Sequence, residues 1–580
     1  MTSVSPLESY ERRVAAALAK LLGAEPAAIA LESPRDASHG DIAFPCFKWA
    51  KERGAAPNAL AAELQKQFNN SLVAGISAKA TGPFLNFVID KSNFAAELLP
   101  AAFGEGFGGM ESNGQSVVNK TIVVDYSSPN IAKRFHVGHL RSTVIGAAVK
   151  RICELRGYKT IGINHIGDWG SQFGKLLTAL RRFGSEAELD RLADGGGAIE
   201  YLQEIYVQYH TEEKKSPEIA QELSAESRKW FLDLESGNDN EARRLWKKLT
   251  LVSLAEFDKL YKRLGVSFDL IRGESAYESD LAPTIEMCKK AGITKISEGA
   301  LVVDIEGQEK PALLQTGDGT TLYLTRDLAS VFYRKNTLKF TKAVYVVGND
   351  QRDHFKELKA VVKRLGHAWS DDIIHADFGM MRLPEGKMST RAGNVIILND
   401  VLESAVERVR EVIQQKNPDI NNPETIAEQV GIGAVIFNDL KQDRRRDVIF
   451  RWDDVLNFDG ETGPYCQYTH ARLASIIRKS GMQPSPNVEF KNLADAGPLL
   501  LAIARFPVHA ALACERYEPH AVAQSALEIA KNANAFYRDH RVLDAGSPEL
   551  VAARLAIVEA ARRTLSKALA LLGVASPAEM

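Results

Sequence analysis

Apolar residues recur along this chain with two different periods, which separate strands from helices. Short β-branched runs that indicate buried strands lie at 121–124, 160–163, 343–347 and 373–378. Between several of these runs, apolar residues recur every three or four positions, as over 137–155, which indicates helices. Strands that alternate with helices predict an α/β unit with a doubly wound parallel sheet, which we place at residues 113–400.

The rest of the chain predicts further units. Residues 1–112 combine helical patterns with a strand-like alternation at 84–88, so we expect a small α+β unit that ends in a Gly-rich linker at 104–114. A highly charged stretch at about 184–250 has few strand signals and indicates a helical insertion carried on the sheet, with a simple solvated helical pair as the alternative. Residues 401–429 are a connecting segment. Residues 430–580 predict an all-α helical bundle, with helices that begin at Pro464, Pro519 and Pro548.

Composition narrows the class of protein only a little. With 580 residues, 45% of them apolar, the chain has ample material for several cores, and a formal charge of −2 gives no global attraction to nucleic acid. Its five cysteines are scattered and include no C-x-x-C pair, so neither a zinc site nor a disulfide framework is indicated. No window approaches a membrane-spanning apolar run, and the N-terminus begins with a helix start at Ser5 and Pro6 in place of a signal peptide. We therefore expect a cytoplasmic protein without membrane contact.

The segment from Asp125 to His139 carries the strongest functional signal. It joins a strand to a helix, and a helix N-terminus presents free backbone N–H groups and a positive dipole end to a bound phosphate. His136, His139 and Lys133 add donors that can follow charge developing on phosphate oxygens. The Gly-rich patterns G-x-G-x-x-G and G-x-x-x-x-G-K-[ST] are both absent from this segment. The sequence therefore predicts a nucleotide site that uses histidines in place of a glycine cradle.

Two motifs give this site a family resemblance. The sequence H-V-G-H at 136–139 resembles the first signature of class I aminoacyl-tRNA synthetases, H-I-G-H, and K-M-S-T-R at 387–391 resembles the second, K-M-S-K-S. The segments at 164–170, 323–327, 347–355 and 463–468 resemble those of arginyl-tRNA synthetases, and the similarity covers essentially the whole chain. The resemblance implies a Rossmann-like catalytic domain at 113–400, a tRNA-contacting N-terminal domain at 1–112 and a helical anticodon-binding domain at 430–580.

The resemblance implies an enzyme, an arginine–tRNA ligase. Such an enzyme activates L-arginine with ATP to arginyl-adenylate and pyrophosphate, and then transfers arginine to the 3′-terminal adenosine of tRNA(Arg). The implied partners are tRNA(Arg), L-arginine and ATP, and we expect a monomer. Mg²⁺ is expected with ATP on general grounds, and no protein-bound zinc is expected. Anticodon bases would stack on aromatic residues of the bundle such as Tyr465, Phe536 or Tyr537.

The resemblance also assigns residues to the amino acid. Tyr323 and Asp327 would hold the guanidinium, Asp125 and Asn130 the α-amino and carboxylate end, and Gln351 would add a polar contact. This is chemically compatible, because carboxylates and amide or hydroxyl acceptors hold a guanidinium best. The residues alone leave alternatives open. Asp327 also suits a helix cap, Asp125 a strand-end carboxylate satisfied by backbone N–H groups, and Gln351 a surface amide.

A second set of residues is implied for ATP and for catalysis. The residues implied for catalysis are His136, His139, Lys133, Lys387 and Ser389, and those for ATP binding are Gly138, Gly348, Asp350, Met380 and Met388. Lys387 and Ser389 would close over the leaving pyrophosphate. Thr390 stands where the class usually has a second lysine. We expect Lys133 to supply the missing positive charge, with Arg391 as the other candidate. The alternative for Lys133 is a solvated surface charge without a catalytic role.

The residues leave other functions open. A synthetase for cysteine, glutamate or glutamine would share the scaffold, but a cysteine enzyme would need zinc-binding thiols and a glutamate enzyme would need cations at Asp125 and Asp327. A tRNA-binding relative without catalysis is disfavoured by the intact His136, His139 and Lys387. A small-molecule nucleotidyltransferase with a similar histidine loop would not need the N-terminal unit or the terminal bundle.

Overall fold

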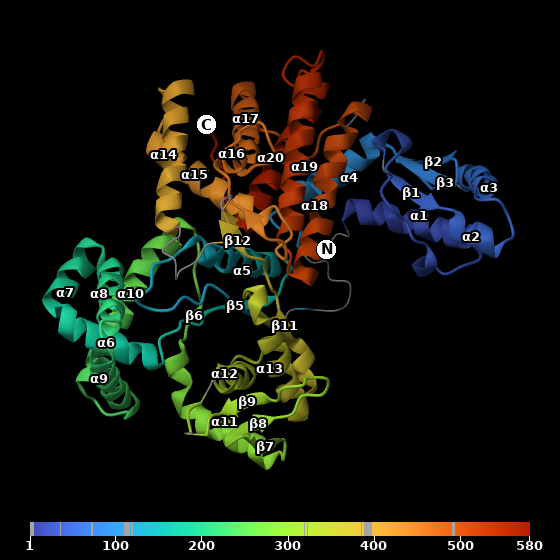
Figure 1. The fold of residues 1–580 in the computed structure, drawn as a ribbon. Coiled ribbons are helices and arrows are strands. Elements are labelled where there is room, and N and C mark those ends of the chain that lie inside the picture. The colour runs from blue at the N-terminus through green and yellow to red at the C-terminus, as the bar shows by residue number, and fades with distance from the viewer. Residues whose placement is uncertain are drawn as a thin grey trace.

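A five-stranded sheet forms the centre of the molecule (Figure 1). The structure, a computed structural model, describes residues 5–580 apart from 35, 71–72, 110–116, 118–119, 318, 322, 384–385, 388–396 and 490–492. The strand order is β11-β10-β4-β5-β6, and every neighbouring pair is parallel. The strands are β4 Thr121–Asp125, β5 Lys159–Asn164, β6 Leu270–Ile271, β10 Lys342–Tyr345 and β11 Ile373–His375. The expected doubly wound α/β fold is confirmed. Only β6 was missed, because two residues carry no periodic pattern.

The strand order reverses beside β4. Helix α5, Val137–Leu155, leads from β4 to β5 on one side, whereas β10 pairs with β4 on the other, with Tyr345 opposite Asp125. Helices α12, Tyr323–Leu338, and α13, Arg352–Arg364, lie before and after β10 in the chain. Open α/β sheets bind ligands at the carboxyl ends of their strands where such a reversal occurs. The loops that follow Asp125 in β4 and Tyr345 in β10 therefore both start at the sheet edge where such folds bind ligands.

Helices fill the connection between β5 and β6 and extend to one side of the sheet (Figure 1). They are α6 Ser171–Phe183, α7 Glu186–Gly195, α8 Ala198–Glu213, α9 Pro217–Glu235 and α10 Glu241–Arg263. These helices share an apolar core that includes Leu177, Leu202 and Leu245. The segment predicted at 184–250 is thus helical, and its own core excludes the alternative of a simple solvated pair.

A second, antiparallel sheet was not predicted. It consists of β7 Thr294–Ser297, β8 Ala300–Val303 and β9 Ala312–Gln315, and it follows α11, Glu278–Lys290. Strand β7 is mostly exposed, so no apolar alternation marks it. Glu298 and Gly299 join β7 to β8 with φ of 49° and 80°, the left-handed values of a two-residue hairpin turn. The Glu-Gly pair was the one local sequence feature that could have indicated this hairpin.

The N-terminal part has the expected α+β composition. Its elements are α1 Pro6–Leu22, β1 Ile42–Pro45, α2 Phe47–Glu52, α3 Pro57–Asn70, β2 Ile76–Thr81, β3 Phe84–Ile89 and α4 Lys91–Phe103, with the strands in the order β1-β3-β2. The described part of the predicted linker is packed against its neighbours. Arg156, which directly follows α5, donates to the carbonyls of Gly108 and Gly109 at 3.0 and 2.6 Å, and the Phe107 ring contacts Phe506.

Helices dominate the chain after the hairpin of β12, Met381–Leu383, and β13, Gly386–Lys387. The later elements are α14 Leu398–Lys416, α15 Pro423–Leu440, β14 Val448–Ile449, α16 Trp452–Val455, α17 Gly463–Ser480, α18 Gly497–Arg516, α19 His520–Asp539 and α20 Pro548–Leu572. Helix α14 occupies much of the expected connecting segment and packs closely on α15. A Cβ at Gly431 of α15 would lie 2.8 Å from the Val406 backbone N.

Two expectations about this bundle are wrong. We expected no window as apolar as a membrane-spanning run, but by length and composition α18 is apolar enough to cross a membrane. In the structure, 67% of its most apolar window is buried inside the protein. It packs against α19, α20, α4 and α5, and a helix surrounded by others is apolar on all sides. Phe536, expected to stack on an anticodon base, is only 5% exposed and belongs to the core. Tyr537 is more accessible, at 37% exposed, and the Arg472 guanidinium lies 4.3 Å from its ring centre.

Candidate active site

The two histidines of the first motif cap α5 with their own side chains. His136 precedes the helix, and its Nδ1 accepts a hydrogen bond from the backbone N–H of Gly138 at 3.1 Å. His139 Nδ1 accepts from the backbone N–H of His136, also at 3.1 Å. Because a backbone N–H only donates, both Nδ1 atoms are acceptors, and a neutral ring then carries its proton on Nε2. Each imidazole therefore has an Nε2–H left to donate to a ligand.

Both imidazoles are neutral near pH 7. Their ring centroids lie 3.9 Å apart. Burial lowers the pKa of His136, and the charge of Lys133 lowers it further. Burial lowers the pKa of His139 to about 3, with a further contribution from His136. The loop thus offers two imidazoles that are predominantly neutral at pH 7 and can donate through Nε2–H.

The loop between β4 and these histidines has an unusual backbone. Ser127, Ser128 and Ala132 have φ values of 73°, 49° and 58°, in the left-handed region that residues other than glycine seldom adopt. The backbone N–H of Ser128 donates to Asn164 Oδ1 at 3.1 Å, and that of Ala132 donates to Ser253 Oγ at 3.0 Å. Strained backbone that surrounding groups hold in place is typical of functional loops.

The second motif comes close to the first through the residues that flank it. Ile397 pairs with His136 as a β-bridge, and the backbone N–H of Leu398 donates to the Phe135 carbonyl at 3.0 Å. The residues that follow the second motif in the chain, Ile397 and Leu398, are therefore in direct contact with the first motif. Four residues of that motif and one side chain lie outside the described residues: Met388, Ser389, Thr390, Arg391 and the side chain of Lys387. Their expected roles stay predictions.

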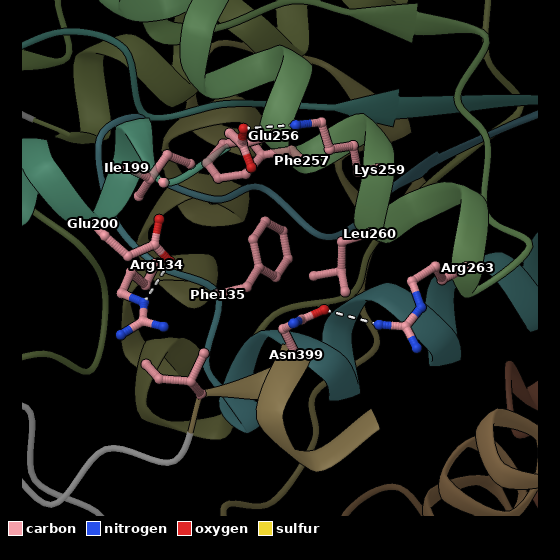
Figure 2. A pocket seen from close by; sticks show the side chains of 12 residues that line it. Arg134, Phe135, Ile199, Glu200, Glu256, Phe257, Lys259, Leu260, Arg263 and Asn399 are labelled. Carbon is pink, nitrogen blue, oxygen red and sulfur yellow. Dashed lines mark hydrogen bonds and ion pairs between the residues drawn. The ribbon is translucent and has the colours of Figure 1, made fainter. Parts of the chain in front are cut away.

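A pocket of about 400 Å³ lies behind the histidine loop. Figure 2 shows the Phe135 ring near Phe257 and Leu260 of α10, and the centroids of the two phenyl rings are 4.9 Å apart in an edge-to-face arrangement. Arg134 forms an ion pair with Glu200 of α8 at 2.9 Å (Figure 2). The helical insertion therefore braces the two residues that precede His136.

A larger cavity, of about 750 Å³, opens between the loop and the insertion. The polar side chains around it include Asn130, Lys133, His136 and His139 from the loop, and Gln172, Gln203, Tyr206, His210 and Lys214 from α6 and the end of α8. Among the described residues no Asp or Glu lines it, and no group of three His, Cys, Asp or Glu side chains is placed to hold a metal ion. These donors suit phosphate groups. They do not fit a protein-held Mg²⁺, so no step below depends on a metal ion.

Asp125, at the end of β4, is buried and already has charged and polar partners. Arg334 Nη2 lies 2.7 Å from Asp125 Oδ2, and Ser128 Oγ donates to Asp125 Oδ1 at 2.8 Å. Arg334 is fully buried, and its guanidinium lies 4.8 Å from the Tyr345 ring centre. The alternative in which backbone N–H groups satisfy Asp125 is therefore wrong, because side chains do so. Any contact between Asp125 and a substrate has to be shared with Arg334.

Tyr323 and Asp327 lie one turn apart on α12, as their spacing predicted. Asp327 Oδ2 is 2.5 Å from His354 Nε2. Burial opposes protonation of His354, but the hydrogen bond and the charge of Asp327 raise the pKa of His354 above its ordinary value. Asp327 lies inside α12, so the helix-cap alternative is wrong. Tyr323 is 74% exposed.

The charges of Asp125 and Asp327 both act on the buried hydroxyl of Tyr345. Burial raises the pKa of Tyr345, the Arg334 charge opposes this rise, and both carboxylates add to it. Tyr345 ends β10 directly opposite Asp125 in the sheet. The two carboxylates, one from β4 and one from α12, therefore lie near the same sheet edge, where the strand order reverses.

Glu274 is an acidic residue near Asp327 that the sequence patterns did not identify. Burial raises the pKa of its carboxyl group to about 7. The charge of Arg326 lowers this pKa, and those of Asp327 and Asp168 raise it. Glu274 begins a single 3-10 turn soon after the two-residue strand β6. Such short elements carry no periodic signal, so only the tertiary structure brings this carboxylate to attention.

The segments expected to bind ATP meet near the carboxyl end of β10. Gly348 pairs with Phe378 as a parallel β-bridge. Gln351 Nε2 donates to Asp350 Oδ2 at 3.2 Å, and both side chains are exposed. Met380, two residues after Phe378, is 45% exposed. The structure therefore brings the two predicted nucleotide segments together, and it leaves Gln351 compatible with a surface amide.

Comparisons with known proteins agree with this geometry. Family models match residues 109–452 (tRNA synthetases class I (R), catalytic domain), 466–580 (DALR anticodon binding domain) and 8–89 (Arginyl tRNA synthetase N terminal domain). Arginine–tRNA ligases of Clostridioides difficile and Streptococcus mutans are 42% and 43% identical over 557 and 555 residues, with 95% of each chain covered. The Thermus thermophilus arginyl-tRNA synthetase structure has a TM-score of 0.81 at 26% identity and covers 99% of this chain and 100% of its own. The chain therefore belongs to the class I arginyl-tRNA synthetases.

Proposed function

We propose that this chain joins arginine to its tRNA at the sheet edge shared by Asp327, Glu274 and the two neutral histidines. The observation that carries the proposal is that three acidic side chains lie close enough to act on common groups: Glu274 with Asp327, and Asp327 with Asp125, both of which act on the Tyr345 phenol at the end of β10. A guanidinium keeps its charge at any physiological pH, so carboxylates are its natural partners. A helix start with free donors is the natural partner of a triphosphate.

The guanidinium lies between Asp327 and Glu274, with the Tyr323 hydroxyl as a further acceptor. His354 now pairs with Asp327 at 2.5 Å, so the substrate shares this carboxylate with His354 or displaces it. Binding a cation next to Glu274 favours its ionised form, which counteracts the rise in its pKa caused by burial. The pocket therefore selects a substrate that is permanently cationic.

Asn130 and Asp125 hold the α-amino and carboxylate end, with Gln351 as a further contact. A Cβ at Gly167 would lie 1.9 Å from Asn130 Oδ1, so the absence of a side chain at Gly167 gives this amide its place. The backbone N–H of Ile131 also donates to the Gly167 carbonyl at 3.2 Å. Asn130 is therefore held in a fixed position ahead of the histidines.

Activation is an in-line displacement at phosphorus. The arginine carboxylate attacks the α-phosphorus of ATP, the bond to the bridging oxygen breaks, and pyrophosphate leaves with that electron pair. His136 and His139 donate their Nε2–H groups to phosphate oxygens as charge spreads over them. Lys133 adds a cation, and Lys387 and Ser389 act on the pyrophosphate from the second motif. Gly138, Gly348, Asp350, Met380 and Met388 contact the nucleotide.

Transfer to tRNA uses the same site. The 3′ end of the tRNA enters the 750 Å³ cavity, where the Tyr206 ring stacks a base and Lys214 neutralises a phosphate. The bundle of α17 to α20 reads the anticodon, and the N-terminal part contacts the tRNA body. The enzyme acts as a cytoplasmic monomer and takes magnesium together with ATP. Light scattering of the purified protein, with and without tRNA, tests the monomer.

Pyrophosphate exchange tests the substrate assignment. Exchange between labelled pyrophosphate and ATP is measured with each of the twenty amino acids in turn, with and without tRNA. We expect exchange with arginine alone. Exchange with lysine or glutamate but not with arginine would overturn the assignment, and exchange with none, in either condition, would favour a tRNA-binding relative without catalysis.

A further inference from the structure

Arg141 is a fully buried arginine on α5, two residues after His139 and so within the same helical turn. Its guanidinium bonds to carbonyls of two other chain segments. Nη1 donates to the carbonyls of Gly379 and Arg446 at 2.5 and 2.9 Å, and Nη2 donates to that of Arg444 at 3.3 Å. Its Nε lies 2.8 Å from Asp439 Oδ1, in an ion pair with α15. One side chain therefore joins the histidine helix to the segment before β12, to the turn before β14 and to α15.

The segment 378–380 has little freedom around this arginine. The backbone N–H of Gly379 donates to the Arg444 carbonyl at 2.8 Å, and a Cβ at Gly379 would lie 2.5 Å from the Arg446 carbonyl carbon. The Arg141 guanidinium lies 5.7 Å from the Phe378 ring centre. Arg141 therefore ties this segment to α5 through the Gly379 carbonyl, while the backbone of Met380 itself donates to the Asp447 carboxylate at 2.8 Å and accepts from the Val448 backbone N–H at 2.9 Å.

The stability of the ion pair alone does not account for this arrangement. Burial raises the pKa of Asp439, while the charge and hydrogen bond of Arg141 lower it, and the rise prevails. Buried ion pairs of this kind are often no more stabilising than an apolar pair of similar volume. What an apolar pair lacks is the fixed fork of donors, which reaches several acceptors at once. The fork of donors therefore indicates a role in geometry.

We propose that Arg141 is a positioning residue for ATP. By holding the carbonyls of Gly379, Arg444 and Arg446, it sets the nucleotide-binding segment 378–380 at a fixed distance from the Nε2–H donors of His136 and His139. The adenosine end and the phosphates of one ATP molecule can then be bound at the same time. This inference rests on the proposed function, because it takes the segment 378–380 as the place of the nucleotide.

Two variants separate positioning from folding. Arg141→Met combined with Asp439→Leu replaces the ion pair by an apolar pair of similar volume and removes the three bonds to carbonyls. Arg141→Lys keeps the charge opposite Asp439 but cannot reproduce the fork. Arg151→Met is the matched control, because Arg151 lies on the same helix and donates to the Gly265 carbonyl at 2.5 Å, away from the nucleotide. All are compared by thermal melting and by arginine-dependent pyrophosphate exchange in the presence of tRNA.

We expect the KM for ATP to rise at least about tenfold in both Arg141 variants, while the KM for arginine stays within about twofold, because a misplacement of about 1 Å costs up to about a hundredfold in such sites. Arg151→Met leaves both constants unchanged. Unchanged ATP constants in a folded Arg141→Lys or double variant would overturn the proposal, as would equal shifts in both constants that follow the loss of thermal stability. Failure of the proposed function has a different signature, since the unsubstituted protein would then show no arginine-dependent exchange.

Discussion

The two ends of the proposed active site are held by different kinds of interaction. At the nucleotide end, neutral imidazoles, backbone carbonyls and the buried Arg141 fix the geometry. At the amino-acid end, ionisable side chains face one another, and the pKa values of Glu274 and His354 are both raised. We infer that selectivity for the substrate arises at the amino-acid end. In the proposed function the nucleotide end is preorganised by fixed hydrogen bonds, whereas the amino-acid end depends on acidic groups whose ionised form a bound cation stabilises.

The largest expected effect comes from removing one charge at the amino-acid end. Asp327→Asn leaves a guanidinium without its main anion, and truncating one partner of such a pair costs about 2–5 kcal/mol. We expect the KM for arginine to rise by about a thousandfold in pyrophosphate exchange, with the KM for ATP unchanged. Asp353→Asn is the control, because Asp353 is an exposed carboxylate on α13 that pairs with Lys356. A change of less than tenfold for Asp327→Asn would contradict the assignment.

The next largest effect tests the nucleotide end. His136→Asn keeps a side-chain oxygen that can cap α5 but removes the Nε2–H donor. We expect kcat for activation to fall about a hundredfold, the usual cost of one donor to a developing negative charge, while the melting temperature and the KM for arginine hold. A kcat within threefold of the unsubstituted enzyme would show that the imidazole acts only as a cap.

The pH dependence of arginine binding sharpens the contrast. Glu274 has a pKa of about 7 in the free protein, so it becomes protonated as the pH falls through 7 and then no longer attracts the guanidinium. His354, whose pKa is raised by Asp327, gains charge in the same direction. We expect the KM for arginine to rise at least about tenfold from pH 8 to pH 6, because one proton with this pKa accounts for about tenfold and His354 adds to it. The KM for ATP should stay level over that range.

The variant Glu274→Gln separates the contribution of Glu274 to the pH dependence of the KM for arginine from that of His354. We expect this variant to have a raised KM for arginine at pH 8 and a much flatter pH profile below it, because only His354 still titrates. If the profile of Glu274→Gln matches that of the unsubstituted enzyme, the pH dependence belongs to His354 and the role assigned to Glu274 is wrong.

The smallest effect concerns Lys133, the expected substitute for the missing second lysine of K-M-S-T-R. Lys133→Ala removes a cation from the cavity rim, and a partly solvated charge contributes about 1 kcal/mol, so we expect activation to slow about fivefold. Arg391→Ala is the matched comparison in single-turnover measurements. An intact activation rate in Lys133→Ala together with a slow Arg391→Ala would transfer the role to Arg391.

Several features were predictable from the sequence because local rules decide them. The alternation of β-branched runs with helical patterns indicated the parallel sheet, and proline followed by an apolar stripe indicated α17 and α20. The motif at 136–139 indicated the phosphate-binding helix start, since a helix begins where its capping residues stand. By contrast, β6, β7 and the helical character of the connecting segment were missed or misjudged. Their patterns are too short, too polar or too ambiguous to show a period.

Local sequence patterns were enough for four strands of the parallel sheet, the chemistry of the histidine loop and the spacing of Tyr323 and Asp327 on one helical face. Only the tertiary structure decided which charges are already paired. It placed Arg334 on Asp125, His354 on Asp327, Glu274 beside Asp327, and Arg141 among three carbonyls and Asp439. The physical reason is that pairing and desolvation depend on residues distant in the chain, which periodicity along the sequence does not relate to one another.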